Sequence, residues 1–260
     1  MNTNSIIHPN AKIGKNVEIG PFCYISEHVE IGDGCRIGPH TTIFDYVRMG
    51  RDCQTFPGCV IGAVPQDLKF GGEESWVEIG DRTVIRECAT IHRGTAASGK
   101  LKTVVGSDCL IMCYGHIAHD CRIGDHVILS GYAGLAGEVD VDDWAILGGA
   151  SVVHQFCKIG AHAMIGGGVV VLKDIPPYVL AGRNPVAYEG LNVIGLRRRG
   201  FTPAQIETIS ACYRLVYESG LRAEEACAQI EAQLPATPER DLIVRFVRAS
   251  TRGIVRPSNR

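Results

Sequence analysis

The stretch CLIMCYGHIAHDCRIG, residues 109–124, repeats one pattern every six residues. Ile111, Ile117 and Ile123 lie six apart, and a small residue stands two positions before each of them. Residues two apart on a strand point to the same face, so each hexad supplies one very short strand with two inward side chains. Polar and glycine-rich residues between the strands are typical of tight corners. The stretch therefore predicts a parallel β-helix built from hexapeptide repeats.

The six-residue pattern continues well beyond this stretch. Twelve aliphatic residues in a row share one phase from Val105 to Val171, and two earlier runs cover residues 7–49 and 79–91. Because 45% of the residues are hydrophobic, chance would produce the run of twelve with a probability on the order of 10⁻⁴. Three hexads make one triangular coil of about 18 residues, and successive coils stack about 4.8 Å apart.

The repeat is interrupted twice and ends before the chain does. Insertions are expected near residues 62–77 and 94–104, because polar residues or an altered spacing replace the aliphatic series there. After Val171, a capping box at Thr202-Pro203 with Gln205 begins a helix. Two more helices are expected over about residues 223–234 and from 237 to near 253. We predict a mainly β protein, with a β-helix over residues 1–185 and a small α-helical domain over 186–260 that covers one coil end.

Composition narrows the function classes. The 260 residues carry a formal net charge of −2, so nucleic acid is not expected as a partner. No apolar run is long enough to predict a membrane span, and the first residues lack the pattern of a secretory signal. Seven of the eleven cysteines occupy the small inward position, where cysteine packs as a small hydrophobe: 23, 35, 53, 59, 109, 121 and 157. Packing in a reducing cytoplasm therefore explains the cysteines better than disulfides or metal binding.

The phase of the hexapeptide repeat predicts that three histidines point away from the core. His116 precedes the inward Ile117, whereas His92 and His154 each follow an inward residue. A solvated surface position is the ordinary explanation for such histidines, and zinc binding is a rival one, because packing between subunits could bring them together.

A corner column beside these histidines combines groups that suit acid–base chemistry. His119 and Asp120 lie at the corner after Ile117, and Gly137 and Gln155 follow one and two coil lengths later in the same column. An imidazole can take a proton near neutral pH, and an adjoining carboxylate can set its tautomer. A glycine N–H can face a developing oxyanion. No serine or cysteine stands in the column, which favours direct attack by a substrate hydroxyl or amine.

Six segments closely resemble the UDP-N-acetylglucosamine O-acyltransferases, hexapeptide-repeat enzymes of the first step of lipid A biosynthesis. They are QDLKF (66–70), EIGDRTVIRECATIHRGT (78–95), VGSDCLIMCYGHIAHDC (105–121), VHQFCKIGAHAMIGGG (153–168), DIPPYVLAG (174–182) and GLRRRGF (195–201). The resemblance spans nearly the whole chain. It implies a left-handed coil, which periodicity alone cannot establish, and a homotrimer with active sites between adjacent subunits.

The resemblance also implies a reaction. A (3R)-hydroxyacyl group would move from acyl carrier protein to the 3-position of the glucosamine in UDP-N-acetylglucosamine. The donor's acyl group is carried on phosphopantetheine, and neither a separate cofactor nor a metal is expected. His119 would be the general base, Asp120 would orient it, and the N–H of Gly137 would face the oxyanion.

Further residues match binding positions of the family. Those lining the cleft between subunits are Gln66, Asp67, Lys69, His92, His116, His154 and Gln155. Asn192 and Arg198 match contacts to the nucleotide or to the phosphopantetheine region of the donor. Gly167 matches a position that limits acyl-chain length, and glycine there implies a longer chain than a bulky residue would allow.

Departures from the family pattern leave the acceptor open. Glu138 and Ile194 stand where some members have histidine and glutamate, so the attacked atom could be a 3-hydroxyl or the nitrogen of a 3-amino sugar. A second alternative is the N-acyltransferase of UDP-3-O-acylglucosamine. That enzyme normally carries an extra N-terminal domain, for which hexads beginning at Ile7 leave no room. A zinc enzyme resembling carbonic anhydrase and a non-catalytic scaffold are the remaining alternatives.

Overall fold

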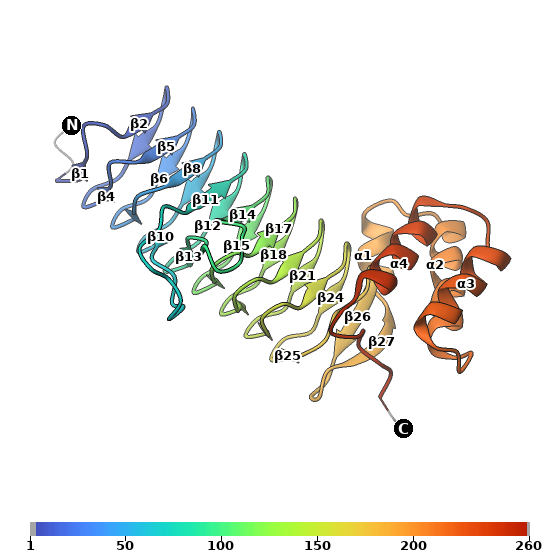
Figure 1. The fold of residues 1–260 in the computed structure, drawn as a ribbon. Helices are drawn as coiled ribbons and strands as arrows, with labels where there is room; N and C mark the ends of the chain where they lie inside the picture. Colours follow the sequence, from blue (N-terminus) through green and yellow to red (C-terminus); the bar gives the residue numbers. More distant parts are fainter. Residues whose placement is uncertain (1–3, 259–260) are drawn as a thin grey trace.

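Short strands follow the hexads along the chain and form the three sides of a long coil (Figure 1). The structure is a computed structural model and describes residues 4–258. From β1 to β25, consecutive strands fall in different sheets and every third strand returns to the same sheet, which is the topology expected of a parallel β-helix. The prediction of a mainly β fold with parallel hexapeptide strands and helices after the coil is confirmed.

Each sheet contains one strand from nearly every coil. The nine-stranded sheet contains, in spatial order, β1 (Ile6–Ile7), β4 (Tyr24–Ile25), β7 (Thr42–Ile43), β10 (Val60–Ala63), β13 (Thr90–His92), β16 (His116–Ile117), β19 (Gly134–Leu135), β22 (Val152–Val153) and β25 (Val170–Val171). The eight-stranded sheet contains β2 (Lys12–Ile13), β5 (Val29–Ile31), β8 (Val47–Met49), β11 (Trp76–Ile79), β14 (Lys102–Val105), β17 (Arg122–Ile123), β20 (Asp140–Val141) and β23 (Lys158–Ile159). The ten-stranded sheet contains β3 (Glu18–Ile19), β6 (Arg36–Ile37), β9 (Gln54–Thr55), β12 (Val84–Ile85), β15 (Leu110–Ile111), β18 (Ile128–Leu129), β21 (Ile146–Leu147), β24 (Met164–Ile165), β26 (Val179–Gly182) and β27 (Ala187–Leu191).

The register stacks equivalent residues of successive coils. Ile117 pairs with Leu135, and Leu135 pairs with Val153, so each of these coils advances the chain by three hexads. These aliphatic side chains are at most 2% exposed. All seven cysteines assigned to the small inward position are also buried. The core is thus a column of aliphatic and small side chains along the coil axis.

One corner position turns with a left-handed backbone conformation. Ten successive residues of this kind, spaced six apart from Asp108 to His162, have φ between 55° and 65°. Residues other than glycine rarely adopt this conformation, and none of the ten is β-branched. Several stack on the equivalent residue of the next coil, as His126 does on Trp144 with ring centroids 3.9 Å apart. Asp120 is one of these ten residues, with φ 61°.

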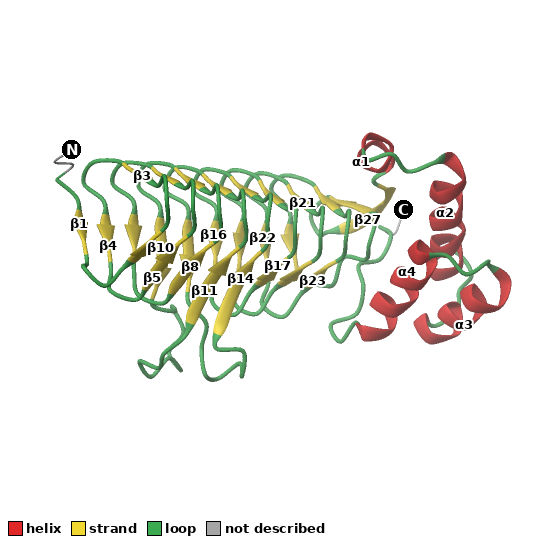
Figure 2. Ribbon diagram, turned by 90° about the horizontal axis from the view of Figure 1, so that it is seen from above, coloured by secondary structure: helices red, strands yellow, loops and turns green. Residues whose placement is uncertain are grey.

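Two long loops leave the coil on the same side, beside β11 and β14 (Figure 2). The first insertion joins β10 to β11, and the second joins β13 to β14. In an uninterrupted coil, Ile61 would pair with Ile79, but it pairs with Ile91 instead. Ile91 likewise pairs with Ile117 rather than with Cys109. Both coils are therefore longer than three hexads, and their extra residues lie in these two loops.

In the part of the chain that the structure describes, four helices follow the coil and lie at its C-terminal end (Figure 1). They are α1 (Val193–Arg198), α2 (Pro203–Tyr217), α3 (Ala223–Gln233) and α4 (Pro238–Ala249). The hydroxyl of Tyr213 on α2 donates a 2.6 Å hydrogen bond to the carbonyl of Pro177 and so ties the helices to the last coil. Among residues 4–258, no helix combines the length and apolarity needed to cross a bilayer.

The helical end differs from the sequence prediction in three places. The capping box of Thr202 and Gln205 forms as predicted. However, the expected boundary at residues 185/186 falls inside the antiparallel hairpin of β26 and β27, so the sheet continues to Leu191. The short helix α1 was not predicted. The last helix ends at Ala249 rather than near residue 253, because the following residues turn back to pair with Asp174.

Candidate active site

The corner between β16 and β17 holds His119 and Asp120 in adjacent turn positions. The Nδ1 atom of His119 lies 2.8 Å from Oδ2 of Asp120. The left-handed backbone at Asp120 bends the chain so that this carboxylate turns back toward its neighbour's ring. The His119 side chain is 15% exposed, and that of Asp120 is 0% exposed. The imidazole therefore has one buried side and one accessible side.

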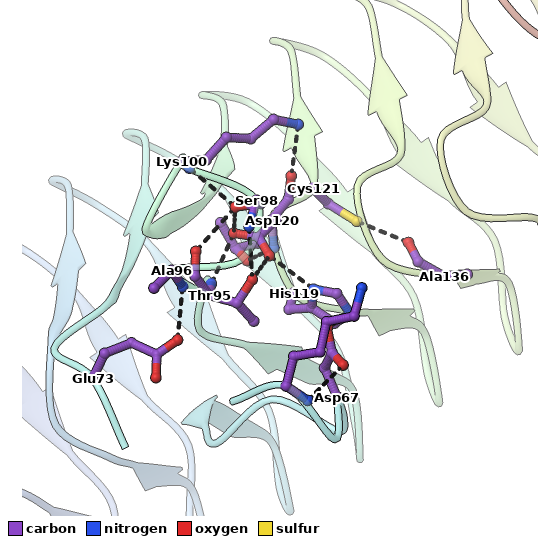
Figure 3. Close-up of polar contacts among 12 residues, drawn as sticks. Asp67, Glu73, Thr95, Ala96, Ser98, Lys100, His119, Asp120, Cys121 and Ala136 are labelled. Carbon is purple, nitrogen blue, oxygen red and sulfur yellow. Dashed lines mark hydrogen bonds and ion pairs between the residues drawn. The ribbon is translucent and has the colours of Figure 1, made fainter. Parts of the chain in front are cut away.

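The second insertion surrounds the carboxylate of Asp120 (Figure 3). Thr95 donates its backbone N–H at 2.8 Å and its hydroxyl at 2.7 Å, and the hydroxyl of Ser98 donates at 2.6 Å. The backbone N–H of Asp120 itself donates to the Thr103 hydroxyl at 2.8 Å. Sequence reasoning missed these residues, since the insertion has no periodicity that would predict where its hydroxyls point.

This arrangement selects one tautomer of the histidine. A carboxylate oxygen accepts hydrogen bonds, so Nδ1 of His119 donates to Asp120 and carries the ring proton. The lone pair of Nε2 then faces the accessible side. Oδ2 of Asp67, from the first insertion, lies 3.8 Å from Nε2. The ring can accept a proton at Nε2 between two carboxylates, which would stabilise the resulting imidazolium.

Gly137 lies against the same ring, one coil further along. A Cβ atom at this position would come within 2.4 Å of both Cε1 and Nε2 of His119. Only glycine therefore permits the observed approach. The Gly137 N–H makes no hydrogen bond within residues 4–258, so it can donate to a bound group.

The outward histidines of the nine-stranded sheet are less exposed than the sequence suggested. His92 is 5% exposed, and its ring meets that of His116 edge to face with centroids 5.0 Å apart. Burial, together with His116 and His119, lowers the pKa of His92 to about 4. Burial also lowers the pKa of His116, whose Nδ1 lies 2.7 Å from the Thr90 hydroxyl. Both rings are thus neutral at pH 7.

Four more predicted site residues are exposed around this corner. Gln66 and Lys69 belong to the first insertion, where the backbone N–H of Lys69 donates to Asp67 at 3.0 Å. His154 and Gln155 lie at the end of β22, two coils beyond β16. Gln66 and Lys69 thus share the first insertion with Asp67, whereas His154 and Gln155 lie further along the coil.

The other predicted site residues lie at different corners of the same chain. Gly167 follows β24, at the corner that leads from the ten-stranded to the nine-stranded sheet. Asn192 caps α1, since its side chain accepts from the N–H of Gly195 and donates to the carbonyl of His162 at 3.0 Å. Arg198 is exposed at the end of α1. A single chain therefore does not bring these three residues together with His119.

The two residues that depart from the family pattern occupy distinct places. Glu138 follows Gly137 in the left-handed corner position, with φ 60°, and its N–H donates to the carbonyl of His119 at 3.0 Å. Ile194 is 69% exposed at the start of α1. Glu138 is therefore bonded through its backbone to His119, whereas Ile194 lies with Asn192 at the helical end.

Two family models match parts of the chain. Residues 10–45 and 102–137 match the bacterial transferase hexapeptide model, and residues 174–255 match "Udp N-acetylglucosamine O-acyltransferase; Domain 2". An acyl-[acyl-carrier-protein]–UDP-N-acetylglucosamine O-acyltransferase of Burkholderia mallei is 48% identical over 200 residues, covering 75% of this chain and 76% of that protein.

The chain belongs to the UDP-N-acetylglucosamine O-acyltransferase family.

Solved structures of the family agree with this assignment. The UDP-N-acetylglucosamine acyltransferase of Bacteroides fragilis is 50% identical and superposes with a TM-score of 0.95, covering 98% of this chain and all of that one. The enzyme from Francisella novicida is 40% identical, with a TM-score of 0.95, and covers 100% of this chain and 94% of that one. The predicted left-handed β-helix with a small helical C-terminal part is the fold of this family.

Proposed function

We propose that this enzyme transfers a (3R)-hydroxyacyl group from acyl carrier protein to the glucosamine 3-position of UDP-N-acetylglucosamine, the first step of lipid A biosynthesis. Its relatives are named for the acyl carrier protein donor and the UDP-N-acetylglucosamine acceptor. The observation that carries the proposed mechanism is the hydrogen bond from His119 to a fully buried Asp120, which leaves Nε2 as the proton acceptor.

His119 acts as general base in this mechanism. Its Nε2 removes the proton from the acceptor's 3-hydroxyl while that oxygen bonds to the thioester carbonyl carbon of the donor. The N–H of Gly137 donates to the oxyanion that forms, and Asp120 stabilises the imidazolium. The carbon–sulfur bond then breaks, and the proton on Nε2 passes to the departing phosphopantetheine thiolate. The acyl carrier is thus the only group carrier in the scheme, and no resident cofactor or metal takes part.

Direct attack by the acceptor is favoured over an acyl-enzyme. The cysteine nearest in sequence, Cys121, points into the core and donates to the carbonyl of Ala136 at 3.2 Å. Burial raises the pKa of its thiol to about 12, so it is protonated at neutral pH and inaccessible. The hydroxyl of Ser98 is occupied by Asp120.

We also propose a homotrimer with active sites between subunits. The outer face of the ten-stranded sheet presents a row of partly exposed apolar side chains in register: Val84, Leu110, Ile128, Ile146 and Met164. Such a row suits contact with another copy of the chain. An adjacent subunit could then bring its own Gly167, Asn192 and Arg198 toward His119. Sedimentation equilibrium tests the stoichiometry.

A reducing cytoplasm is the compartment we propose for this activity. All eleven cysteines are free thiols, nine of them buried, which suits a compartment that keeps thiols reduced.

The function is tested by assaying transfer from hydroxyacyl carrier protein to UDP-N-acetylglucosamine and to its 3-amino analogue. Wild type should acylate the 3-hydroxyl, and His119→Ala should reduce kcat by about 10²-fold or more while remaining folded. No transfer to either acceptor would refute the proposed function. Near-normal turnover by a folded His119→Ala variant would refute the proposed base. Transfer to the 3-amino sugar alone would instead identify an N-acyltransferase, and metal analysis of the same preparation tests the zinc alternative.

A further inference from the structure

Both carboxylate oxygens of Asp120 are fixed by two hydrogen bonds each. Oδ1 accepts from the Thr95 N–H and the Ser98 hydroxyl, whereas Oδ2 accepts from the Thr95 hydroxyl and from Nδ1 of His119. The three distances to the insertion are 2.6–2.8 Å. Three of the four donors thus belong to the second insertion and only one to the coil. From the described part of the coil itself, only His119 donates to this carboxylate.

We propose that Thr95 and Ser98 are positioning residues for the acyl transfer, which act by holding the Asp120 carboxylate against Nδ1 of His119. The proposal deepens the proposed function, and its turnover readouts rest on that function. It also assigns a purpose to the second insertion, because the added segment brings two hydroxyls and one N–H to a carboxylate that lies well beyond it in the chain.

Neutral donors suit this task better than a cation would. A buried carboxylate without hydrogen bonds is costly, and it would rotate, take up water or become protonated. Hydroxyl and N–H donors satisfy its oxygens without neutralising the negative charge that stabilises the imidazolium. A neighbouring cation, Lys100, donates to the backbone carbonyl of Asp120 at 3.2 Å rather than to its carboxylate.

Internal bonds shape the insertion for this contact. The Ser98 hydroxyl oxygen also lies 3.0 Å from the carbonyl oxygen of Thr95, and the N–H of Lys100 donates to that hydroxyl at 3.0 Å. A carboxylate oxygen of Glu73 accepts from the N–H of Ala96 at 2.7 Å (Figure 3). Glu73 belongs to the first insertion, which also carries Asp67. The two insertions are therefore joined: the first places Asp67 beside Nε2 of His119, and the second holds Asp120, which bonds to Nδ1.

The charged and titratable groups around the dyad of His119 and Asp120 come from the two insertions and from β13, β16 and β20. Asp67 of the first insertion lies 3.8 Å from Nε2 of His119. Lys100 of the second insertion lies near Asp120 and is 3.8 Å from Asp140 on β20. The neutral rings of His92 on β13 and His116 on β16 complete the set. None of them donates to the Asp120 carboxylate, so Thr95 and Ser98 are the side chains to vary.

The test compares Thr95→Val, Ser98→Ala and the double variant with the conservative Thr95→Ser. Valine keeps the shape of threonine but removes the hydroxyl, and serine restores it. Thr83→Val is the matched control. Its buried hydroxyl also makes two hydrogen bonds, to the Gly106 carbonyl and from the Cys109 N–H, but lies in the core, away from the dyad.

We expect the double variant to lose on the order of 10-fold to 100-fold in kcat, the loss typical of removing hydrogen bonds from a buried charge. KM for UDP-N-acetylglucosamine should change little, because neither hydroxyl faces the accessible side of His119. The acid limb of the kcat/KM profile should move to higher pH, since a carboxylate with fewer neutral donors holds the imidazolium proton more tightly. Thr95→Ser should recover most of the loss, and Thr83→Val should lose stability without losing kcat.

Any of three results would overturn the proposal. The folded double variant could keep the wild-type kcat and pH profile, Thr95→Ser could lose as much activity as Thr95→Val, or Thr83→Val could reduce kcat equally. If the double variant does not fold, the same comparison of kcat and pH profile is made with Thr95→Val and Ser98→Ala singly.

A spectroscopic readout separates this inference from the proposed function. In protein with ¹⁵N-labelled histidine, the Nδ1–H signal of His119, assigned by its loss in His119→Gln, should shift and exchange faster in Thr95→Val. An unchanged signal overturns the positioning role. If wild type transfers no acyl group, the proposed function fails, but this signal still tests whether Thr95 holds the dyad.

Discussion

Replacing Gly137 by alanine adds one methyl group at the point where the coil touches the His119 ring. The new Cβ would lie 2.4 Å from Cε1 and Nε2, whereas ordinary contacts begin near 3.4 Å. The ring or the turn must therefore move by about 1 Å. The φ of Gly137 is not positive, so alanine adds no backbone strain and the variant should fold.

The displaced ring should lose activity much more than stability. A shift of about 1 Å stretches the 2.8 Å hydrogen bond to Asp120 and moves Nε2 from its line of attack, a misplacement that costs about 10²-fold in rate. We therefore expect kcat to fall by about 10²-fold, with a Tm close to that of wild type. The assays are steady-state transfer at saturating donor and acceptor, and thermal unfolding at one fixed protein concentration.

Gly131→Ala is the matched control. Gly131 occupies the same turn position one hexad earlier, and its added Cβ would meet Sγ of Cys113 at 3.4 Å, an ordinary contact. This variant should keep wild-type turnover. The reasoning is refuted if Gly137→Ala keeps its kcat, or if Gly131→Ala loses as much, since close packing against the His119 ring would then not explain the effect.

Three further predictions concern stability and loop order. The pKa of His92 falls to about 4 in the folded protein, below its unfolded value near 6.5. The folded protein should therefore lose stability as the pH falls from about 6.5 to 4, because protonation of His92 favours the unfolded state. Over this range the wild-type Tm should drop more than the Tm of His92→Asn, and equal drops would contradict the burial argument. Glu73→Ala should accelerate hydrogen exchange at the Ala96 N–H, because it removes the carboxylate that joins the two insertions; unchanged exchange would show that the insertions are ordered independently. Asn192→Ala should lower the stability of the helical end by about 1 kcal/mol through loss of the side chain that accepts from Gly195 and caps α1; an unchanged free energy of unfolding would contradict the capping role.

The coil could be predicted because the six-residue repeat indicates which side chains point inward. A six-residue repeat of aliphatic residues is direct evidence of short strands and corners, and the packing of Ile111, Ile117 and Ile123 confirms it. The hairpin of β26 and β27 and the helix α1 escaped prediction, since such short segments carry too little pattern to distinguish them from a loop.

The pairing of His119 with Asp120 could be predicted from the sequence, whereas the residues around the pair could not. His119 and Asp120 are adjacent in sequence, so the phase alone placed both at one corner. Thr95 and Ser98 reach Asp120 from a segment without periodicity, and nothing local to the insertion indicates which way its hydroxyls point. The burial of His92 likewise depends on packing that a strand's phase does not describe, because phase gives only the side of the sheet.

The three-hexad register fixes the distance from His119 to the helical end in steps of one coil. Each coil adds about 4.8 Å, and three such steps lead from His119 through Gly137 and Gln155 to Lys173, just before the chain turns into the helical end. The chain departs from whole hexads between Ile91 and Val105, which lie 14 residues apart, and the second insertion takes up the difference. From Val105 to Val171 the spacing is strictly six, so a change in reach between His119 and α1 would require a different number of coils or different side chains along them.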